Sequence, residues 1–453
     1  MTKAIEPNKL YRIDLDGCAV EGLAVGRLHG RAVFVPLGAP GDSAMVRITH
    51  IGQRKIIGKL EEVITPSDQR TEPVCPVFGK CGGCQLQHLK YSAQLQFKTQ
   101  ILKDALRSIA GFSDPGAIPM TPSCEQTGYR NRGQYPVARK NNRVVTGFFE
   151  ARSHQVIPTE RCLLHHEDMD HAVLAVRTWA GRKSVPVYDE HSHEGWLRHV
   201  VVRRSHGTGE VLVTIVGTGQ RSHDIGDLTR TMRKKNPKVV GLVTNINRDR
   251  TNVVLGRKNQ VIWGRGWIEE HLGPLRFRLS TGSFFQVNTL QALNLFDRVS
   301  EFCRSSNGTV VDAYCGVGAM ALTLAMGGLK VIGIEISRQA ILDARKACVD
   351  NSIKATFHQG RVEKVLPRLV DDGLKPSVVI LDPPRKGCHR KVLESAARSG
   401  SERIAYISCN PGSLARDLAL LFELGYEMEQ LETFDMFPHT AHVETFAGLK
   451  KTR

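Results

Sequence analysis

The sequence predicts a multidomain protein with a small all-β barrel, a mixed or mostly β middle domain and a C-terminal doubly wound α/β sheet. Three observations lead to this prediction. Short alternating apolar runs fill the first 65 or so residues, three closely spaced cysteines follow them, and strand and helix patterns alternate over about the last 170 residues. The 453 residues are enough for two or three buried cores. We place the domains at 1–70, 71–280 and 281–453.

Composition narrows the class of partner. Lys and Arg outnumber Asp and Glu by 62 to 45, and the formal net charge of +17 favours an anionic partner such as nucleic acid. The basic residues are spread over many runs, whereas a membrane surface would need a concentrated basic amphipathic helix. No apolar run approaches the roughly 18 residues of a membrane span, and the first residues lack the apolar core of a signal peptide. We therefore expect a cytoplasmic monomer.

Residues 7 to about 65 contain the alternating runs RAVFVP, AMVRITHI and KIIGKLEEVI, separated by Gly, Pro and Asp. This pattern predicts a barrel of the OB type, a frame that often holds oligonucleotides. A β module without a nucleic-acid role would show the same pattern.

A cysteine cluster follows the predicted barrel. CPVFGKCGGC spaces Cys75, Cys81 and Cys84 as C-x5-C-x2-C, and the odd total of 11 cysteines argues against a disulfide framework. Thiolate-rich ligation suits an iron–sulfur cluster or zinc, and either needs a fourth ligand. Cys162 in IPTERCLLHH is our candidate. In a zinc site, His88, His165 or His166 would be an alternative fourth ligand. If no metal binds, the three cysteines are close in the sequence without a common role.

The middle of the chain changes pattern twice. The spacing of Leu, Phe and Ile predicts one amphipathic helix over 91–109. From about 125 to 280, the runs RVVTGFF, LRHVVVRR, EVLVTIVG and KVVGLVTNIN carry basic residues between apolar ones and predict strands.

The last domain alternates strands and helices. GTVVDAYCGVGAMALTLAMGG predicts a strand, a glycine turn and a helix, and KVIGIEIS, ATFHQ, PSVVILDPPRKG and RIAYISCNPG supply four further strands. Gly316 and Gly318 let the backbone approach a ligand at the strand ends, and Glu335 is suited to binding ribose hydroxyls. A dinucleotide site would share these features, but Met320 and Ala321 replace its third glycine. With Asp-Pro-Pro after the fourth strand, an S-adenosylmethionine site becomes the better interpretation.

The stretch ISCNP indicates the chemistry. In methyltransferases of exocyclic amines, an aromatic residue follows a related Asp-Pro-Pro, whereas this chain has Arg385. C5 of a pyrimidine is a poor nucleophile, but a thiolate that adds to C6 makes C5 part of an enolate. We assign this role to Cys409, at a strand end before a helix that could lower its pKa. Glu444 in HVETFAGL is our candidate for the base that removes the C5 proton. A structural cysteine and a solvated carboxylate are the alternatives.

Taken together, SCNP, DPPRKG, DAYCGVGA, FFQVN and HVETFAGL resemble the RNA uracil-5 methyltransferase family. The resemblance covers nearly the whole chain and is strongest from about 280 to 449. It implies a Rossmann-like class I methyltransferase domain and a TRAM domain for the barrel, with Cys409 as nucleophile and Glu444 as base. It also implies a [4Fe-4S] cluster on Cys75, Cys81, Cys84 and Cys162. Contacts to S-adenosylmethionine are implied for Gln286, Tyr314, Gly316, Gly318, Ala319, Glu335 and Asp382.

The chain departs from the family at two places. Family members often have Asn in the glycine turn, where this sequence has Val317 and Ala319, so we expect backbone contacts there. The polar residue often found after the third strand is replaced by QGRVEK, near Arg361.

The resemblance favours RNA as partner and large-subunit (23S) ribosomal RNA as substrate. The T-loop uridine of transfer RNA is the nearest alternative. A cytosine-5 RNA methyltransferase, or a non-catalytic RNA-binding iron–sulfur protein, would be a different class.

Overall fold

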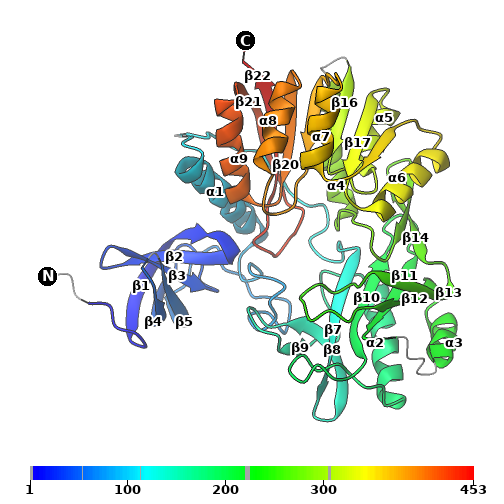
Figure 1. The fold of residues 1–453 in the computed structure, drawn as a ribbon. Coiled ribbons are helices and arrows are strands. Elements are labelled where there is room, and N and C mark those ends of the chain that lie inside the picture. Colours follow the sequence, from blue (N-terminus) through cyan, green and yellow to red (C-terminus); the bar gives the residue numbers. More distant parts are fainter. Residues whose placement is uncertain (1–3, 54, 113, 220–224, 305–307, 453) are drawn as a thin grey trace.

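The computed structural model describes residues 4–53, 55–112, 114–219, 225–304 and 308–452. Three large sheets organise them: a closed barrel near the N-terminus, a seven-stranded sheet in the middle of the chain and an eight-stranded sheet at the end. In Figure 1 the barrel forms a lobe to one side, and the two larger sheets lie one above the other. No helix in the described part of the chain is long and apolar enough to cross a membrane.

The predicted N-terminal barrel is confirmed, and it is a closed barrel of five strands. Its strands follow the order β1-β2-β3-β5-β4, and β4 returns to pair with β1. The bounds are β1 (Leu10–Ala19), β2 (Leu23–Leu28), β3 (Arg31–Pro36), β4 (Ser43–Ile51) and β5 (Ile56–Thr65), with a short 3-10 helix η1 (Val20–Gly22) after β1. Alternate residues such as Ile13, Leu15, Val33 and Val35 are buried, so one face of each strand fills the interior.

The four runs predicted as strands in the middle of the chain form β8, β10, β11 and β12, in a sheet with both parallel and antiparallel pairs. The order is β13-β12-β11-β10-β7-β8-β9, with one parallel pair, β11–β12. The strands are β7 (Arg132–Lys140), β8 (Arg143–Phe149), β9 (Val156–Pro158), β10 (Leu197–Arg204), β11 (Val211–Gly217), β12 (Val239–Ile246) and β13 (Lys258–Gly264). Helices α2 (Glu167–Arg182) and α3 (Ile225–Lys235) pack on it, and Val176 and Trp179 of α2 are buried in its core. A hairpin of β14 (Trp267–Leu272) and β15 (Leu275–Ser280) leads to the last sheet.

The last sheet has the order β18-β17-β16-β19-β20-β22-β21-β6, and its first five strands are parallel. Its strands are β6 (Met120–Thr121), β16 (Thr309–Ala313), β17 (Lys330–Glu335), β18 (Thr356–Gln359), β19 (Val378–Leu381), β20 (Arg403–Ser408), β21 (Tyr426–Phe434) and β22 (Glu444–Lys451). All five strands predicted from the sequence are present. β22 runs antiparallel to β20, so the start of β22 lies beside the end of β20.

Helices cover both faces of this sheet. One core contains side chains of α4 (Thr289–Arg304), α5 (Ala319–Met326) and α6 (Arg338–Asp350). The other contains side chains of α7 (Val362–Asp371), α8 (Arg390–Arg398) and α9 (Pro411–Glu423). The predicted helix α1 (Tyr91–Ile109) forms and joins this second core through Leu102 and Leu106. α1 and β6 thus pack with the C-terminal sheet, although both precede the middle sheet in the chain (Figure 1).

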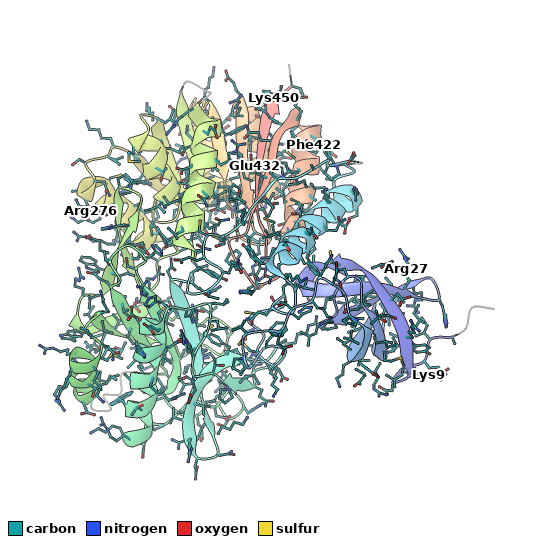
Figure 2. All side chains as sticks on the ribbon, turned by 180° about the vertical axis from the view of Figure 1, so that it is seen from behind. Lys9, Arg27, Arg276, Phe422, Glu432 and Lys450 are labelled. Carbon is teal, nitrogen blue, oxygen red and sulfur yellow. The ribbon has the colours of Figure 1, made fainter. Side chains whose placement is uncertain are left out.

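Residues 70–89, which we call the cysteine loop, contact all three parts. Arg70 pairs with buried Asp42 of the barrel, Cys81 forms a β-bridge to Glu150 after β8, and Gln85 donates to His439 before β22. Basic side chains lie on more than one part of the surface, as Figure 2 shows for Lys9 and Arg27 on the barrel and Arg276 and Lys450 on the C-terminal part.

Candidate active site

The residues singled out by the sequence meet where the parallel strands end. Tyr314 follows β16, Asp382 follows β19 and Cys409 follows β20. Ser408, the last residue of β20, pairs with Thr445, so the antiparallel register brings the following residue, Cys409, beside Glu444, the first residue of β22. The Glu444 carboxylate raises the pKa of the Cys409 thiol, as expected for neighbours. The fold therefore brings a thiol and two carboxyl groups to one edge of the sheet.

The SCNP motif fixes the backbone around Cys409. Asn410 caps α9, and its Oδ1 accepts hydrogen bonds from the backbone of Gly412 at 3.0 Å and Ser413 at 3.3 Å. Pro411 occupies the first turn, where a missing N–H costs nothing. The Asn410 Nδ2 also donates to the carbonyl of Arg385 at 3.0 Å, which joins the SCNP and DPPR loops.

The expectation that α9 lowers the pKa of Cys409 is wrong. Burial raises this pKa to about 11, the Glu444 charge raises it further, and Arg385 opposes both. In the free protein the thiol is therefore protonated at neutral pH.

Two carboxyl groups share the site. Burial raises the pKa of Asp382 to about 7. Burial, with the Asp382 charge added, raises the pKa of Glu444 well above its ordinary value, and Arg385 opposes this shift. Like charges so close together favour a shared proton at neutral pH. The pair can therefore accept or release a proton near the thiol.

Arg385 occupies the position where amine methyltransferases have an aromatic residue. One of its terminal nitrogens lies 3.1 Å from Nε2 of His442, in the loop before β22. Burial and the Arg385 charge lower the pKa of His442 to about 4, so this imidazole is neutral and can accept a hydrogen bond from the guanidinium. The positive charge of Arg385 lowers the pKa of the Cys409 thiol and of the Glu444 carboxyl group.

A pocket at the glycine turn of Gly316 and Gly318 adjoins this site. It is lined by Gln286, Tyr314, Gly316, Ala319 and Asp382, which the sequence singled out, and by apolar side chains such as Phe285 and Ile407. Gly316 has φ 55°, and a Cβ there would meet nothing closer than 4.0 Å, so the turn faces open space. Gly318 has φ 81° and begins α5. Both glycines are needed for a left-handed backbone.

Polar groups in this pocket and beside it suit S-adenosylmethionine, although Glu335 and Gly318 do not line the pocket themselves. Glu335 accepts hydrogen bonds from the backbone of Gly316 at 3.2 Å and of Ser337 at 2.7 Å, so its carboxylate is held at the end of β17. Asp312, which sequence reasoning missed, also lines the pocket; it is 2% exposed, and its Oδ2 has no hydrogen-bond partner. A buried carboxylate oxygen without a donor suits a cationic or hydroxyl-bearing ligand. Its only sequence signal was a charged residue inside an apolar strand.

The four predicted ligand cysteines, Cys75, Cys81, Cys84 and Cys162, line one cavity of about 400 Å³. Burial raises the pKa of Cys84 to about 11 and of Cys162 to about 12, and nearby cysteines add to both shifts. In the described part of the chain, however, no three His, Cys, Asp or Glu side chains are grouped closely enough to hold a metal ion. Of the predicted alternatives, His88 lies 3.0 Å from the carbonyl of Gly38, so its Nε2 is engaged elsewhere. Among the described residues, the structure collects four thiols without assembling a metal site.

The same cavity reaches the active site. Arg385 and His442 line it together with the cysteines, and Phe284, whose side chain is 60% exposed, lies on both this cavity and the pocket of the glycine turn. Arg130 and Arg132 also line it. A continuous basic and aromatic surface of this kind is suited to a nucleic-acid strand.

Comparisons with known proteins identify the family. A family model described as tRNA (Uracil-5-)-methyltransferase matches residues 232–452. An uncharacterised RNA methyltransferase of Halalkalibacterium halodurans is 36% identical over 448 residues, covering 98% of each chain. One of Clostridium tetani is 37% identical over 446 residues, covering 97% of this chain and 96% of its own.

A solved structure is similar along the whole chain. The Pyrococcus abyssi tRNA (uracil-54, C5)-methyltransferase in complex with S-adenosyl-L-homocysteine superposes with a TM-score of 0.79 and 28% identity, over 97% of this chain and 100% of the other. The resemblance stated from the motifs is thereby confirmed. The chain is an S-adenosylmethionine-dependent RNA methyltransferase and belongs to the RNA uracil-5 methyltransferase family.

Proposed function

We propose that the protein converts uridine in RNA to 5-methyluridine through a covalent bond between Cys409 and C6 of the base. The observation that carries this proposal is the meeting of Cys409, Glu444 and Asp382 at the end of the parallel strands, beside the pocket of the glycine turn. A thiol with an adjacent base is what methylation at C5 of uracil requires, because C5 becomes nucleophilic after a thiolate has added to C6.

The reaction follows from these groups. Cys409 loses its proton to solvent, its thiolate adds to C6, and the electron pair of the C5=C6 bond moves to form an enolate. Bound S-adenosylmethionine supplies an electrophilic methyl group on a sulfonium. C5 attacks that carbon, and the carbon–sulfur bond breaks with its electrons on sulfur. Glu444 takes the C5 proton, and the electron pair left behind re-forms C5=C6 and expels the thiolate. The expelled thiolate regains a proton and Glu444 releases the one it took, so the net change is one methyl group transferred and one proton released.

Arg385 has two proposed tasks in this sequence. Its charge lowers the pKa of both Cys409 and Glu444, so it favours the thiolate and the ionised base that the first and last steps need. The hydrogen bond to His442 holds the guanidinium over the site. Asp382 lines the pocket of the glycine turn and acts on Glu444, so we place it between the cofactor and the base.

The target base must leave its stack to reach Cys409, which costs a few kcal/mol and favours loops over paired RNA. The exposed Phe284 ring offers a surface on which a flipped base can stack. We propose that the barrel (1–70) and the middle domain (71–280) hold the flanking RNA, and that the domain from 281 onward, a Rossmann-like class I methyltransferase domain, performs the transfer. Phosphate contacts by basic residues make binding weaken as salt rises.

Large-subunit ribosomal RNA, the substrate predicted from the sequence, remains our first candidate. The T-loop uridine of transfer RNA is the second, because the Pyrococcus abyssi relative acts on uracil-54 of tRNA and its likeness includes the barrel. Assays with each RNA separately decide between them.

We also propose that Cys75, Cys81, Cys84 and Cys162 hold a [4Fe-4S] cluster. Support comes from their common cavity and from the chemistry of four half-buried thiols, which ligate iron–sulfur clusters as thiolates. Such a cluster would join the cysteine loop to the middle domain, and methyl transfer itself needs no electron. Iron and sulfide analysis of anaerobically purified protein should give about four of each, and Cys162→Ser should lose most of both. Stoichiometric zinc instead of iron would contradict this assignment.

The covalent mechanism has a direct test. RNA in which 5-fluorouridine replaces uridine carries no C5 proton, so the adduct formed after methyl transfer cannot be resolved. Incubation with the protein and S-adenosylmethionine should give a complex that survives denaturing electrophoresis, with Cys409 as the modified residue by peptide mass spectrometry. Cys409→Ala, with an unchanged circular dichroism spectrum, should give none. An adduct on another residue, or full activity of this variant, would reject the mechanism.

A further inference from the structure

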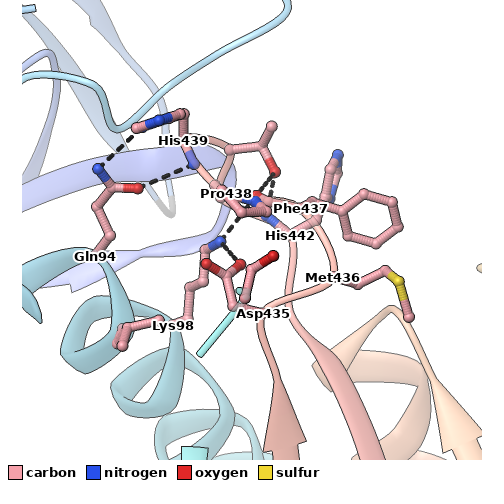
Figure 3. Close-up of polar contacts among 12 residues, drawn as sticks. Gln94, Lys98, Asp435, Met436, Phe437, Pro438, His439 and His442 are labelled. Atoms are coloured by element: carbon pink, nitrogen blue, oxygen red, sulfur yellow. Dashed lines mark hydrogen bonds and ion pairs between the residues drawn. The ribbon is translucent and has the colours of Figure 1, made fainter. Parts of the chain in front are cut away.

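The loop of residues 435–443, between β21 and β22, leads into the proposed base. It carries His442, and Glu444 follows it as the first residue of β22. Its internal hydrogen bonds are few and local, such as those from the backbone and side chain of Thr440 to the carbonyl of Phe437. Several of the bonds that fix its course come instead from α1, as Figure 3 shows for Lys98 and Gln94. Others come from the cysteine loop.

Lys98 of α1 anchors the first half of this loop. Its side chain is fully buried, and its Nζ lies 2.5 Å from Oδ1 of Asp435 and 3.0 Å from the carbonyl of Phe437. Burying an ion pair costs desolvation that an apolar pair of similar volume would avoid, so stability alone does not require it. An ion pair does fix the distance and the relative orientation of its two side chains, and this pair joins residues 337 positions apart in the chain.

Gln94 anchors the second half. Its side chain is 1% exposed, its Oε1 accepts a hydrogen bond from the backbone of His439 at 3.0 Å, and its Nε2 donates to the carbonyl of Leu89 at 3.0 Å. The carbonyl of His439 in turn accepts from the backbone of Gln85 and Leu86 in the cysteine loop. The N–H and the C=O of one loop residue are thus both engaged by other elements.

His439 is also strained. Its φ of 68° lies in the left-handed region, which costs a residue with a Cβ on the order of 1 kcal/mol and persists when the surroundings impose it. His439 precedes His442 by three positions and Glu444 by five. The cysteine loop continues this clamp, because the side chain of Gln85 accepts from the backbone of Ala441 at 3.2 Å.

We propose that Gln94 and Lys98 are positioning residues that clamp the 435–443 loop in a strained shape and thereby aim Glu444 at C5 of the target base. This inference rests on the proposed function. A base displaced by about 1 Å can slow a reaction roughly 100-fold. Loss of the clamp should leave cofactor binding, thiol addition and methyl transfer in place and slow the last step, removal of the C5 proton. The methylated RNA should then remain attached to Cys409.

The test uses the full-length protein with ordinary uridine RNA and methyl-labelled S-adenosylmethionine. Gln94→Leu removes the side-chain hydrogen bonds of Gln94, including a third one to the His439 ring, at nearly unchanged volume. Gln100→Leu is the matched control, because Gln100 is an exposed residue of α1 whose side chain donates to Asp104 within the same helix. Glu444→Gln is the reference for a missing base. Lys98→Met and Lys98→Arg form a second pair, in which arginine should restore part of the turnover.

We expect Gln94→Leu to bind S-adenosylhomocysteine within twofold of the wild type, to release 5-methyluridine RNA at least tenfold more slowly, and to accumulate a labelled adduct on denaturing gels, as Glu444→Gln does. Hydrogen exchange of residues 437–442 should be faster in Gln94→Leu and unchanged in Gln100→Leu, which gives a readout independent of activity. Wild-type release or unchanged exchange in Gln94→Leu, while Glu444→Gln traps the adduct, overturns the positioning role. Absence of the adduct in Glu444→Gln overturns the proposed function instead.

Discussion

Replacing Arg385 by methionine removes a positive charge that lowers the pKa of Cys409. Burial, with the help of Glu444, holds that pKa at about 11 even with Arg385 present, so about one thiol in 1000 is ionised at pH 8. Because the thiolate is the nucleophile, alkylation of Cys409 in the free protein should accelerate about tenfold per pH unit from pH 8 to pH 10.

The effect of Arg385→Met follows from the same electrostatics. An opposite charge within about 4–6 Å lowers a pKa by roughly 1 to 3. The Arg385 side chain is exposed, so water screens it and the lower end applies. Alkylation should therefore be about tenfold slower than in the wild type at each pH from 8 to 10.

The assay is timed reaction with iodoacetamide across this pH range, with the Cys409 peptide quantified by mass spectrometry so that the other cysteines do not interfere. Arg390→Met is the matched control, because Arg390 is an exposed arginine of α8 that pairs with Glu394. It should react at the wild-type rate. Equal or faster alkylation of Cys409 in Arg385→Met would refute the assigned role of the guanidinium.

Three further predictions follow from the structure. Gly318→Val places a Cβ 3.1 Å from that of Ala344 at φ 81°, so calorimetry should show S-adenosylhomocysteine binding at least about tenfold weaker. Asp382→Asn should raise the melting temperature at pH 8 but not at pH 4. The carboxyl group of Asp382 has a pKa of about 7 in the folded protein and an ordinary, lower pKa in the unfolded chain, so its contribution to stability falls as pH rises from about 4 to 7. Arg70→Ala leaves buried Asp42 without its partner, and urea unfolding should show a loss of about 3–5 kcal/mol at neutral pH.

Much of the site could be predicted because its signals are local. Gly316 and Gly318 lie in a turn between a strand and a helix, Asp382 follows a strand, and Cys409 precedes a helix cap. Each can therefore be recognised from a few neighbouring residues. Parallel strands bring such positions to one edge of a sheet whatever their distance in sequence. Glu444 was found through the chemistry that Cys409 requires.

The rest depends on contacts between distant segments. The pKa of Cys409 is set by burial, and a sequence pattern does not measure burial at a strand end. The predicted helix 91–109 forms, but its amphipathic pattern does not say which sheet it covers, and its partner is the sheet that comes last in the chain. The pairing of Lys98 with Asp435 likewise has no local signal, since both read as surface charges.

The measurement that tests the central claim most directly is nucleoside mass spectrometry of RNA treated with the purified protein and S-adenosylmethionine. Unmodified ribosomal RNA and transfer RNA are incubated separately, each with the wild type and with Cys409→Ala. The account predicts 5-methyluridine in one of the two RNAs with the wild type and none with Cys409→Ala. Methylated cytidine, a methylated exocyclic amine, or 5-methyluridine formed by Cys409→Ala would contradict it.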